Sequence, residues 1–377
     1  MKVSILDLVA QYATIKEEID RAVAGVIESG QFILGPQVKV LEQEMASYCQ
    51  TSHAVGVASG TDALHLALRV CGIGEGDGVI TSAFTFIATA EAISYVGATP
   101  IFLDIEGNSF NLDPNQVEDF LKGRLKRPGW PNAKRPKAIL PVHLYGRSAE
   151  MRTLTEMASQ YGLRVIEDCA QAIGAEHGGR RVGSWGDAGC FSFFPTKNLG
   201  GYGDGGMVTT QDANLAERLR TLRQHGSRTR YYHEELGFNS RLDEIQAAIL
   251  RVKLQHLETW IEGRRRIADF YRQALRDGDV VAPLDDPQGR HVYNQFTLRV
   301  PRRDALQDYL KERGIATMIY YPLSLHQQKV YADLEYREGD LPQSELAARE
   351  VISLPVHPEL APEQTAFVAE TIRSFYR

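Results

Sequence analysis

The sequence has few cysteines, and their spacing suggests neither a disulfide framework nor a metal site. Cys49, Cys71, Cys169 and Cys190 are scattered, with no C-x-x-C pair and no regularly spaced histidines near them. Reduced, mostly buried thiols are the simplest interpretation of this pattern, and a zinc site is disfavoured. We therefore predict no metal.

Long apolar runs are also missing. No segment approaches the roughly 18 uninterrupted apolar residues that a membrane-spanning helix requires. The short apolar run near the amino terminus is interrupted by Asp7 and Gln11, and it has neither the length nor the cleavage-site pattern of a signal peptide. These features predict a cytoplasmic protein with no membrane partner.

The chain carries no strong excess of charge of one sign. Its 42 Lys and Arg residues against 48 Asp and Glu residues give a formal net charge of -6. Such a balance provides no long-range attraction for nucleic acid or anionic lipid, so small molecules are the expected partners. A chain of 377 residues, 43% of them hydrophobic, can bury a sizeable core, and its length favours two domains.

Between residues 36 and 210 the chain alternates strand and helix patterns. This rhythm is typical of an α/β domain with a mostly parallel sheet. The predicted strands are 53–59, 78–84, 99–105, 138–146, 163–171 and 206–210, and the predicted helices between them are 61–72, 89–97 and 150–162.

The patterns change after a long helix predicted over 241–275. They then indicate a small α+β unit, so we predict a large cofactor-binding domain, 1–250, and a small carboxyl-terminal domain, 251–377. An amino-terminal helix pair is expected to pack on the large domain or on a partner, and residues 122–137 are expected to form an exposed loop without function. The predicted elements outside the alternating region are helices 14–29, 36–49, 304–314 and 362–376 and strands 292–300 and 316–322.

The segment "FSFFPTKNLGGYGDGG", residues 191–206, contains a single lysine, Lys197, after an apolar run. A deprotonated lysine amine attacks a carbonyl and forms a Schiff base, which arginine does not do. Burial favours the neutral amine, and the neighbouring Phe191, Phe193 and Phe194 could provide that burial. Lys197 is therefore a candidate for imine chemistry.

The glycines after Lys197 allow a second interpretation. Gly201, Gly203 and Gly206 match G-x-G-x-x-G, but that dinucleotide fingerprint requires a helix after the loop. Here the strand pattern "GMVTT" follows instead. A nicotinamide-dependent oxidoreductase is thus the weaker alternative, and the glycines are expected to let the backbone pass close to a bound ring.

A pair of acidic candidates lies at the end of the strand in "VIEDCAQA". Ligands bind beyond the carboxyl ends of strands in open α/β sheets, which places Glu167 and Asp168 at such a point. A helix cap or an ion pair would explain them equally well. Together with a Schiff-base lysine, Asp168 could keep the ring nitrogen of pyridoxal phosphate protonated.

An anion pocket is predicted in "ASGTDALHL". Ser59, Gly60 and Thr61 follow a strand and begin a helix, where free backbone N–H groups and the helix dipole favour a phosphate. An ordinary helix N-cap is the alternative explanation of this segment.

Five blocks, in this order, resemble the DegT/DnrJ/EryC1/StrS family of pyridoxal-phosphate-dependent nucleotide-sugar aminotransferases. They are "SGTDAL", "TFIATAEAI", "IEDCAQAIGA", "SFFPTKNLGGYGDGG" and "GFNSRLDEIQAAIL", and the likeness extends from residues 30–36 to 353–360. The resemblance implies a type I aminotransferase fold and a homodimer with shared active sites.

The resemblance also implies roles for individual residues. Lys197 matches the Schiff-base lysine, whose presence argues against the family's dehydrases, which carry histidine there. Asp168 matches the partner of the pyridine nitrogen, Gln171 a residue packed on or beside the ring, and Phe86 the stacking aromatic. Phosphate contacts are implied for Gly60, Thr61 and Ser192, and for Asn239, which would reach the phosphate of the neighbouring subunit.

The implied reaction transfers the amino group of L-glutamate to a keto nucleotide sugar by ping-pong kinetics. Arg230, Tyr321 and His326 would suit a hydroxylated, phosphate-linked substrate, although a solvated loop or a satisfied surface histidine would explain them as well. The blocks "GQFILGP" and "RYYHEELGFNSRLDEIQAA" resemble the members that act at C3, and transfer at C4 is the alternative. A cofactor-binding regulator without turnover is a further alternative, which would need an additional effector domain.

Overall fold

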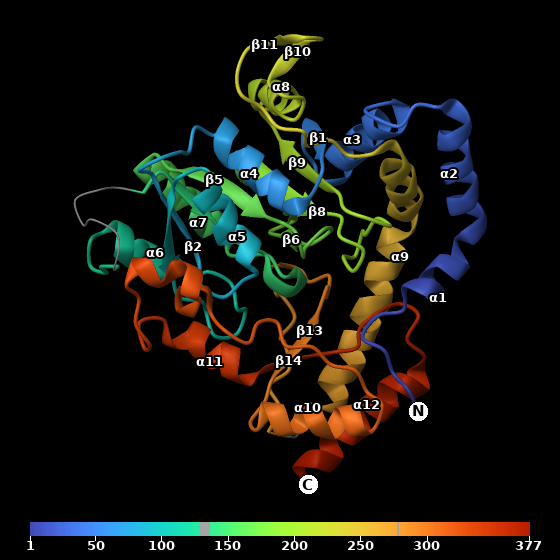
Figure 1. Cartoon of the computed structure of the whole chain (residues 1–377). Helices are drawn as coiled ribbons and strands as arrows, with labels where there is room; N and C mark the ends of the chain where they lie inside the picture. Colours follow the sequence, from blue (N-terminus) through green and yellow to red (C-terminus); the bar gives the residue numbers. More distant parts are fainter. Residues whose placement is uncertain (128–135, 277–278) are drawn as a thin grey trace.

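The computed structural model describes residues 1–127, 136–276 and 279–377, so residues 128–135 of the predicted loop lie outside the described part. Its centre is a seven-stranded sheet whose strands are parallel except β9, which runs antiparallel to both of its neighbours (Figure 1). This arrangement confirms the predicted α/β class. The strand order is β1 (His53–Val57), β9 (Gly206–Thr210), β8 (Ala188–Ser192), β5 (Arg164–Asp168), β4 (Ala138–Leu140), β2 (Gly78–Ser82) and β3 (Thr99–Leu103).

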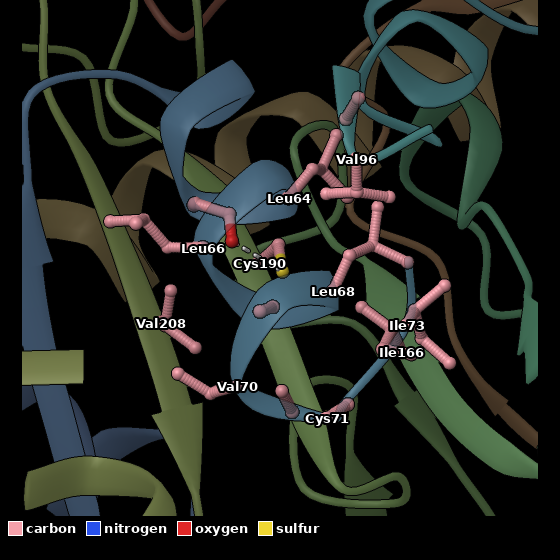
Figure 2. Packing of buried hydrophobic residues seen from close by; sticks show 14 of the residues in the cluster. Leu64, Leu66, Leu68, Val70, Cys71, Ile73, Val96, Ile166, Cys190 and Val208 are labelled. Carbon is pink, nitrogen blue, oxygen red and sulfur yellow. Dashed lines mark hydrogen bonds between the residues drawn. The ribbon is translucent and has the colours of Figure 1, made fainter. Parts of the chain in front are cut away.

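Helices cover the sheet because its strands are apolar on both faces; every residue of β2, β4 and β9 is buried. Figure 2 shows one side of this packing, where Leu68 of α4 (Gly60–Val70) lies on the side of Ile166 and Val70 on the side of Val208. The covering helices are α4 (Gly60–Val70), α5 (Ile87–Tyr95), α6 (Pro114–Leu121), α7 (Met151–Tyr161) and α8 (Ala213–Leu222).

The long helix α9 (Glu244–Ala274) connects two hydrophobic clusters. Leu250 and Ile261 pack with residues of the large sheet region, whereas Ala268 and Tyr271 pack with the carboxyl-terminal elements. The helix is continuous across residue 250, and the division into two domains there stays a prediction. The amino-terminal helices α1 (Leu8–Thr14), α2 (Lys16–Ser29) and α3 (Pro36–Tyr48) precede the sheet, and α2 and α3 pack along α9 (Figure 1).

The carboxyl-terminal part contains elements that the sequence analysis missed, among them β12 (Gly289–Arg290), β14 (Val351–Leu354) and α11 (Pro342–Glu350), and it lacks one strand that was predicted. β13 (Phe296–Arg299) pairs antiparallel with β14 (Val351–Leu354), which was not predicted. The predicted strand 316–322 is wrong: it makes only a single bridge, between Met318 and Ser353, because the ladder of β13 is formed with β14. The helices here are α10 (Arg303–Glu312), α11 (Pro342–Glu350) and α12 (Pro362–Tyr376).

Short strands complete the described structure. The hairpin β10 (Ser227–Thr229) and β11 (Tyr232–His233) projects beyond α8 at the top of Figure 1. A three-stranded sheet joins β12 (Gly289–Arg290), β6 (Glu176–His177) and β7 (Arg180–Arg181). Among the described helices, none combines the length and the hydropathy needed to cross a membrane.

Candidate active site

Lys197 lies in the connection between β8 and β9, directly beyond the carboxyl end of a parallel strand. Its backbone N–H donates to the carbonyl of Phe194 at 2.9 Å, which forms a tight turn. Desolvation lowers the pKa of its amine from 10.5 to about 8, and the charge of Asp168 opposes this shift. About one amine in ten is therefore neutral at pH 7, far more than for a solvated lysine.

The aromatic residues before Lys197 do not all play the predicted role. Phe191 and Phe193 are buried in the cluster between the sheet and α9, whereas Phe194 is 50% exposed. Phe193 and Phe194 follow the end of β8 at Ser192, where the chain leaves the sheet, and only Phe193 stays in that cluster. The expectation that all three rings are buried around Lys197 is therefore wrong for Phe194, and a contribution of Phe191 and Phe193 to the burial of Lys197 stays a prediction.

Asp168 is the last residue of β5, and its side chain is buried. One carboxylate oxygen accepts from the hydroxyl of Thr89 at 2.8 Å, and the other from the N–H of Ala170 at 3.1 Å. Burial is the larger influence and raises the pKa of Asp168, although both hydrogen bonds oppose it. A cation beside this carboxylate would stabilise its charged form.

Thr89 is a residue that the sequence analysis missed. It is buried on α5, and its hydroxyl lies 3.1 Å from that of Thr85 as well as bonding Asp168. Its signal was present in the block "TFIATAEAI", since Phe86 and Thr89 are three residues apart and therefore on one face of the helix.

The predicted anion pocket forms at the start of α4. The hydroxyl of Ser59 accepts from the N–H of Asp62 at 3.1 Å, so Ser59 is the N-cap. The N–H groups of Gly60 and Thr61 belong to the first turn, where the helix offers no acceptor. A Cβ on Gly60 would lie 2.6 Å from the Cβ of Ser192, which places the end of β8 against this turn.

Gly206 brings β9 equally close to the same turn. A Cβ at this position would lie 2.2 Å from the carbonyl oxygen of Ser59. The glycine therefore fixes the distance between β9 and the start of α4. The first-turn N–H groups, together with the hydroxyls of Thr61 and Ser192, provide the donors that a phosphate requires, so the cradle fits a phosphorylated cofactor.

Three predicted residues meet beside the carboxyl ends of the strands. The amide of Gln171 donates to the phenol oxygen of Tyr321 at 3.0 Å and accepts from the N–H of Tyr145 at 2.8 Å. The ring of Tyr321 lies 6.1 Å from that of Phe86, the residue before α5. A buried amide held from both sides and an aromatic pair can flank a planar ring.

Three other predicted residues, Arg230, Asn239 and His326, do not lie beside Gln171 and Tyr321 within the single chain. Arg230 is exposed between β10 and β11, with its guanidinium 5.0 Å from the ring centroid of Tyr231, and Asn239 is exposed. His326 is buried, with Nε2 3.1 Å from Glu345, and burial lowers the pKa of its imidazole. A buried histidine beside a carboxylate is explained by packing, so its substrate role, like those of Arg230 and Asn239, stays a prediction.

The glycines after Lys197 pack against the protein itself. A Cβ on Gly201 would lie 2.7 Å from Oε1 of Gln246, and a Cβ on Gly203 would lie 2.9 Å from its Nε2. These two glycines therefore let α9 approach the segment, which gives a reason for them other than the predicted passage close to a bound ring. The strand β9 follows, so the loop does not have the strand–loop–helix context of a dinucleotide site.

His143, Glu167 and Cys169 form the one group in the described ranges that has the spacing of metal ligands. Glu167 and Cys169 flank Asp168 in the chain. The polar atoms of this group already have protein partners. Nε2 of His143 lies 3.1 Å from Glu167, and Nδ1 accepts from the N–H of Ala149 at 3.0 Å. The carboxylate of Glu167 also accepts from the backbone N–H groups of Gly183, Trp185 and Gly186. The cluster is explained as a hydrogen-bonded support for the end of β5.

A cavity of about 640 Å³ lies elsewhere, between α3, β1 and α8, with Lys39 and Arg223 among its lining residues. None of the predicted site residues lines it. The site around Lys197 is defined by its chemistry and by the ends of the strands, where ligands bind in open α/β sheets, rather than by this cavity.

A lysine with a lowered pKa, a buried aspartate and a phosphate cradle at one edge of a mixed sheet define the class of pyridoxal-phosphate-dependent aminotransferases. The model of the DegT/DnrJ/EryC1/StrS aminotransferase family matches residues 13–373. The chain therefore belongs to this family, and pyridoxal phosphate is its cofactor.

Three relatives resemble the chain over nearly its whole length. A "Pleiotropic regulatory protein" of Geobacillus stearothermophilus is 52% identical and covers 100% of this chain and 99% of its own. A UDP-N-acetyl-3-dehydro-alpha-D-glucosamine 3-aminotransferase of Acidithiobacillus ferrooxidans is 48% identical, covering 98% and 97%. A dTDP-3-amino-3,4,6-trideoxy-alpha-D-glucose transaminase of Streptomyces venezuelae is 45% identical, covering 99% and 96%.

A solved structure is similar in fold as well. DesV of S. venezuelae, in complex with a ketimine intermediate, is 45% identical, with a TM-score of 0.94 over 100% of this chain and 99% of that one. This agreement confirms the predicted aminotransferase fold.

Proposed function

We propose that the protein transfers an amino group from L-glutamate to C3 of a 3-keto nucleotide sugar. The observation that carries the proposal is the pairing of an intact Lys197–Asp168 site with two relatives of 48% and 45% identity, each named for a 3-amino or 3-dehydro sugar. Their names differ in the nucleotide but agree in the position, so the proposal specifies C3 and leaves the base open.

Different residues of the chain would hold the phosphate, the ring nitrogen and the ring of the cofactor. Gly60, Thr61 and Ser192 would hold the phosphate, Asp168 the protonated ring nitrogen, and Phe86 with Gln171 the two faces or edges of the ring. When bound, pyridoxal phosphate supplies an aldehyde that carries the amino group and a ring that withdraws electrons from the adjacent carbon.

Lys197 has the properties of a proton carrier in this reaction. Its pKa, lowered to about 8, lies within about one unit of neutral pH, so both the charged and the neutral amine are populated and the group can accept and return a proton. The carboxylate of Asp168, which accepts a hydrogen bond from Thr89, would stabilise a positive charge on the ring nitrogen of the bound cofactor. Donor and acceptor would then use the same residues in opposite directions, which predicts ping-pong kinetics.

The experiment that tests the proposal compares a 3-keto and a 4-keto nucleotide sugar side by side, with glutamate as donor. We expect 2-oxoglutarate to form with the 3-keto sugar. Activity confined to the 4-keto sugar would establish the alternative, and activity with another amino donor only would refute the role of glutamate.

The proposal includes a homodimer with shared sites. The hairpin that carries Arg230 is short and projects from the body, and it exposes Tyr231 and Tyr232 by 78% and 72%. A two-stranded hairpin of this size is marginal in water by itself, and exposed aromatic groups mark interaction sites. Contact with a second copy would bury these rings and bring Arg230 and Asn239 to the neighbouring site.

A regulator without turnover is a second candidate, favoured by the name of the relative at 52% identity. The site favours catalysis, because Asp168 would keep the ring nitrogen protonated, and that charge serves the withdrawal of electrons rather than binding alone. The same assay separates the two: a protein that binds the cofactor but forms no 2-oxoglutarate with any keto sugar would support the regulator. We also place the protein in the cytoplasm, since its four cysteines are buried and unpaired.

A further inference from the structure

The segment that follows Lys197 is held by two side chains of α9, in a way that the reaction itself does not explain. The ammonium of Lys253 donates to the carbonyl of Gly200 at 2.8 Å and lies 4.2 Å from the ring centroid of Tyr202. The amide oxygen of Gln246, two helical turns earlier, accepts from the N–H of Tyr202 at 2.8 Å. Both contacts fall within five residues of Lys197.

Lys253 is unusual for a residue of a helix core. It is 1% exposed, and among the described residues no carboxylate lies within ion-pair distance of it. Burial lowers the pKa of its amine to about 8. Burying a cation without an ion-pair partner is costly, so a leucine or methionine at this position would give a more stable helix packing.

The glycine at position 201 belongs to the same arrangement, because a side chain there would collide with Gln246. The N–H of Gly201 donates back to the carbonyl of Phe193 at 2.8 Å, which closes the loop around Lys197. On its outer side the ring of Tyr202 meets that of Tyr12 from α1, at 6.1 Å. The segment after Lys197 is thus held by α9 on its inner side and, through the ring of Tyr202, by α1 on its outer side.

We infer that Lys253 and Gln246 are positioning residues that fix the segment after Lys197 from α9 and thereby orient its amine toward the reacting carbon. The inference rests on the proposed role of Lys197 but not on the identity of the sugar. Misplacing a catalytic group by about 1 Å can cost about 100-fold in rate, which is why a costly buried cation would be kept here.

The test uses Lys253→Met and Gln246→Leu, which keep the volume and remove the contacts. In the cofactor-free protein, we expect the amides of residues 198–204 to exchange hydrogen about tenfold faster in both variants. We also expect pyridoxal phosphate to be taken up more slowly, and kcat with the proposed substrates to fall about 10- to 100-fold with little change in KM.

Arg264→Met is the matched control. Arg264 is also a buried cation of α9 that donates to backbone carbonyls, but its acceptors are Tyr293 and Val356 in the carboxyl-terminal part. This variant is expected to lower the melting temperature without faster exchange in 198–204. If Lys253→Met does not fold, Gln246→Leu alone decides the matter, since Gln246 is only half-buried.

Wild-type exchange and uptake rates in the folded variants would overturn the inference, as would a loss of kcat without faster exchange in 198–204. Exchange and cofactor uptake need no nucleotide sugar. A wild-type protein that turns over no keto sugar would therefore refute the proposed function and leave the positioning role to be decided by these two measurements.

Discussion

At the scale of single residues, the site depends on two ionisable groups that burial shifts in opposite senses. Burial raises the pKa of Asp168 and lowers that of Lys197, so the neutral form of each side chain is more populated in the cofactor-free protein than it would be in water. Each shift costs stability while no ligand is bound. Ionisable residues whose pKa values are shifted by burial in this way are typical of functional sites.

Asp168→Asn is expected to reduce kcat by about 10²–10³-fold, because it removes the charge that stabilises a protonated ring nitrogen. The folded pKa of Asp168 is raised, so its carboxylate costs stability above that pKa and the cost fades as pH falls through it. The cofactor-free variant should therefore melt no lower than the wild type at pH 7. A fully active variant, measured by steady-state kinetics, would show that the role is misassigned.

For Lys197, the rate at which the cofactor-free protein takes up pyridoxal phosphate should rise with pH around a midpoint of about 8. Only the neutral amine attacks an aldehyde, and its fraction increases through its pKa. Stopped-flow absorbance at a series of pH values measures this midpoint. A midpoint above 10 would mean that the amine is solvated.

At the scale of elements, the ends of β1 and β8, the start of β9 and the start of α4 form the phosphate cradle through close contacts at Gly60 and Gly206. Gly206→Ala would place a Cβ 2.2 Å from the carbonyl oxygen of Ser59, a backbone atom that cannot move alone. Overpacking of this kind costs about 1–3 kcal/mol, so we expect the affinity for pyridoxal phosphate to fall about tenfold or more.

Gly25→Ala provides the matched control for that variant. Gly25 lies within α2 with nothing near its missing Cβ, and alanine there should stabilise the protein by about 0.5–1 kcal/mol without affecting the cofactor. Fluorescence titration with pyridoxal phosphate measures both variants. Equal affinities in the two would contradict the cradle as described.

The sequence was sufficient for the elements with local signals. The alternation of strands and helices, the helix start at Gly60 and the position of Asp168 at a strand end all follow from periodicity and are confirmed. The partner of β13 did not follow, because β14 lies about fifty residues away and its pairing is decided by packing. The aromatic run around Tyr320 and Tyr321 suggested a strand, but those rings pack in a hydrophobic cluster instead.

The site was predictable only in part, because some of its contacts join residues that are far apart in the sequence. Lys197 and Gly60 could be found because each stands in a distinctive local context, whereas the hydrogen bond from Thr89 to Asp168 joins residues 79 positions apart. His326 resembled a substrate ligand in sequence because nothing local indicates its buried pairing with Glu345.

At the scale of the whole molecule, shared active sites in the proposed dimer predict that two inactive variants restore activity when they are mixed. Lys197→Ala and Arg230→Ala should each be inactive alone, since they remove the reactive amine and a substrate contact. If Arg230 serves the neighbouring site, each mixed dimer contains one intact site, so equal mixing should restore about a quarter of wild-type activity. No recovery after refolding the mixture, or full activity in a sedimenting monomer, would contradict shared sites.

The most direct test of the account is to reconstitute the pure protein with pyridoxal phosphate, reduce it with borohydride and map the modified peptide. We expect a single irreversible label, on Lys197. A label on another lysine, including Lys253, whose pKa is also lowered to about 8, or a protein that stays colourless and unlabelled, would contradict this assignment.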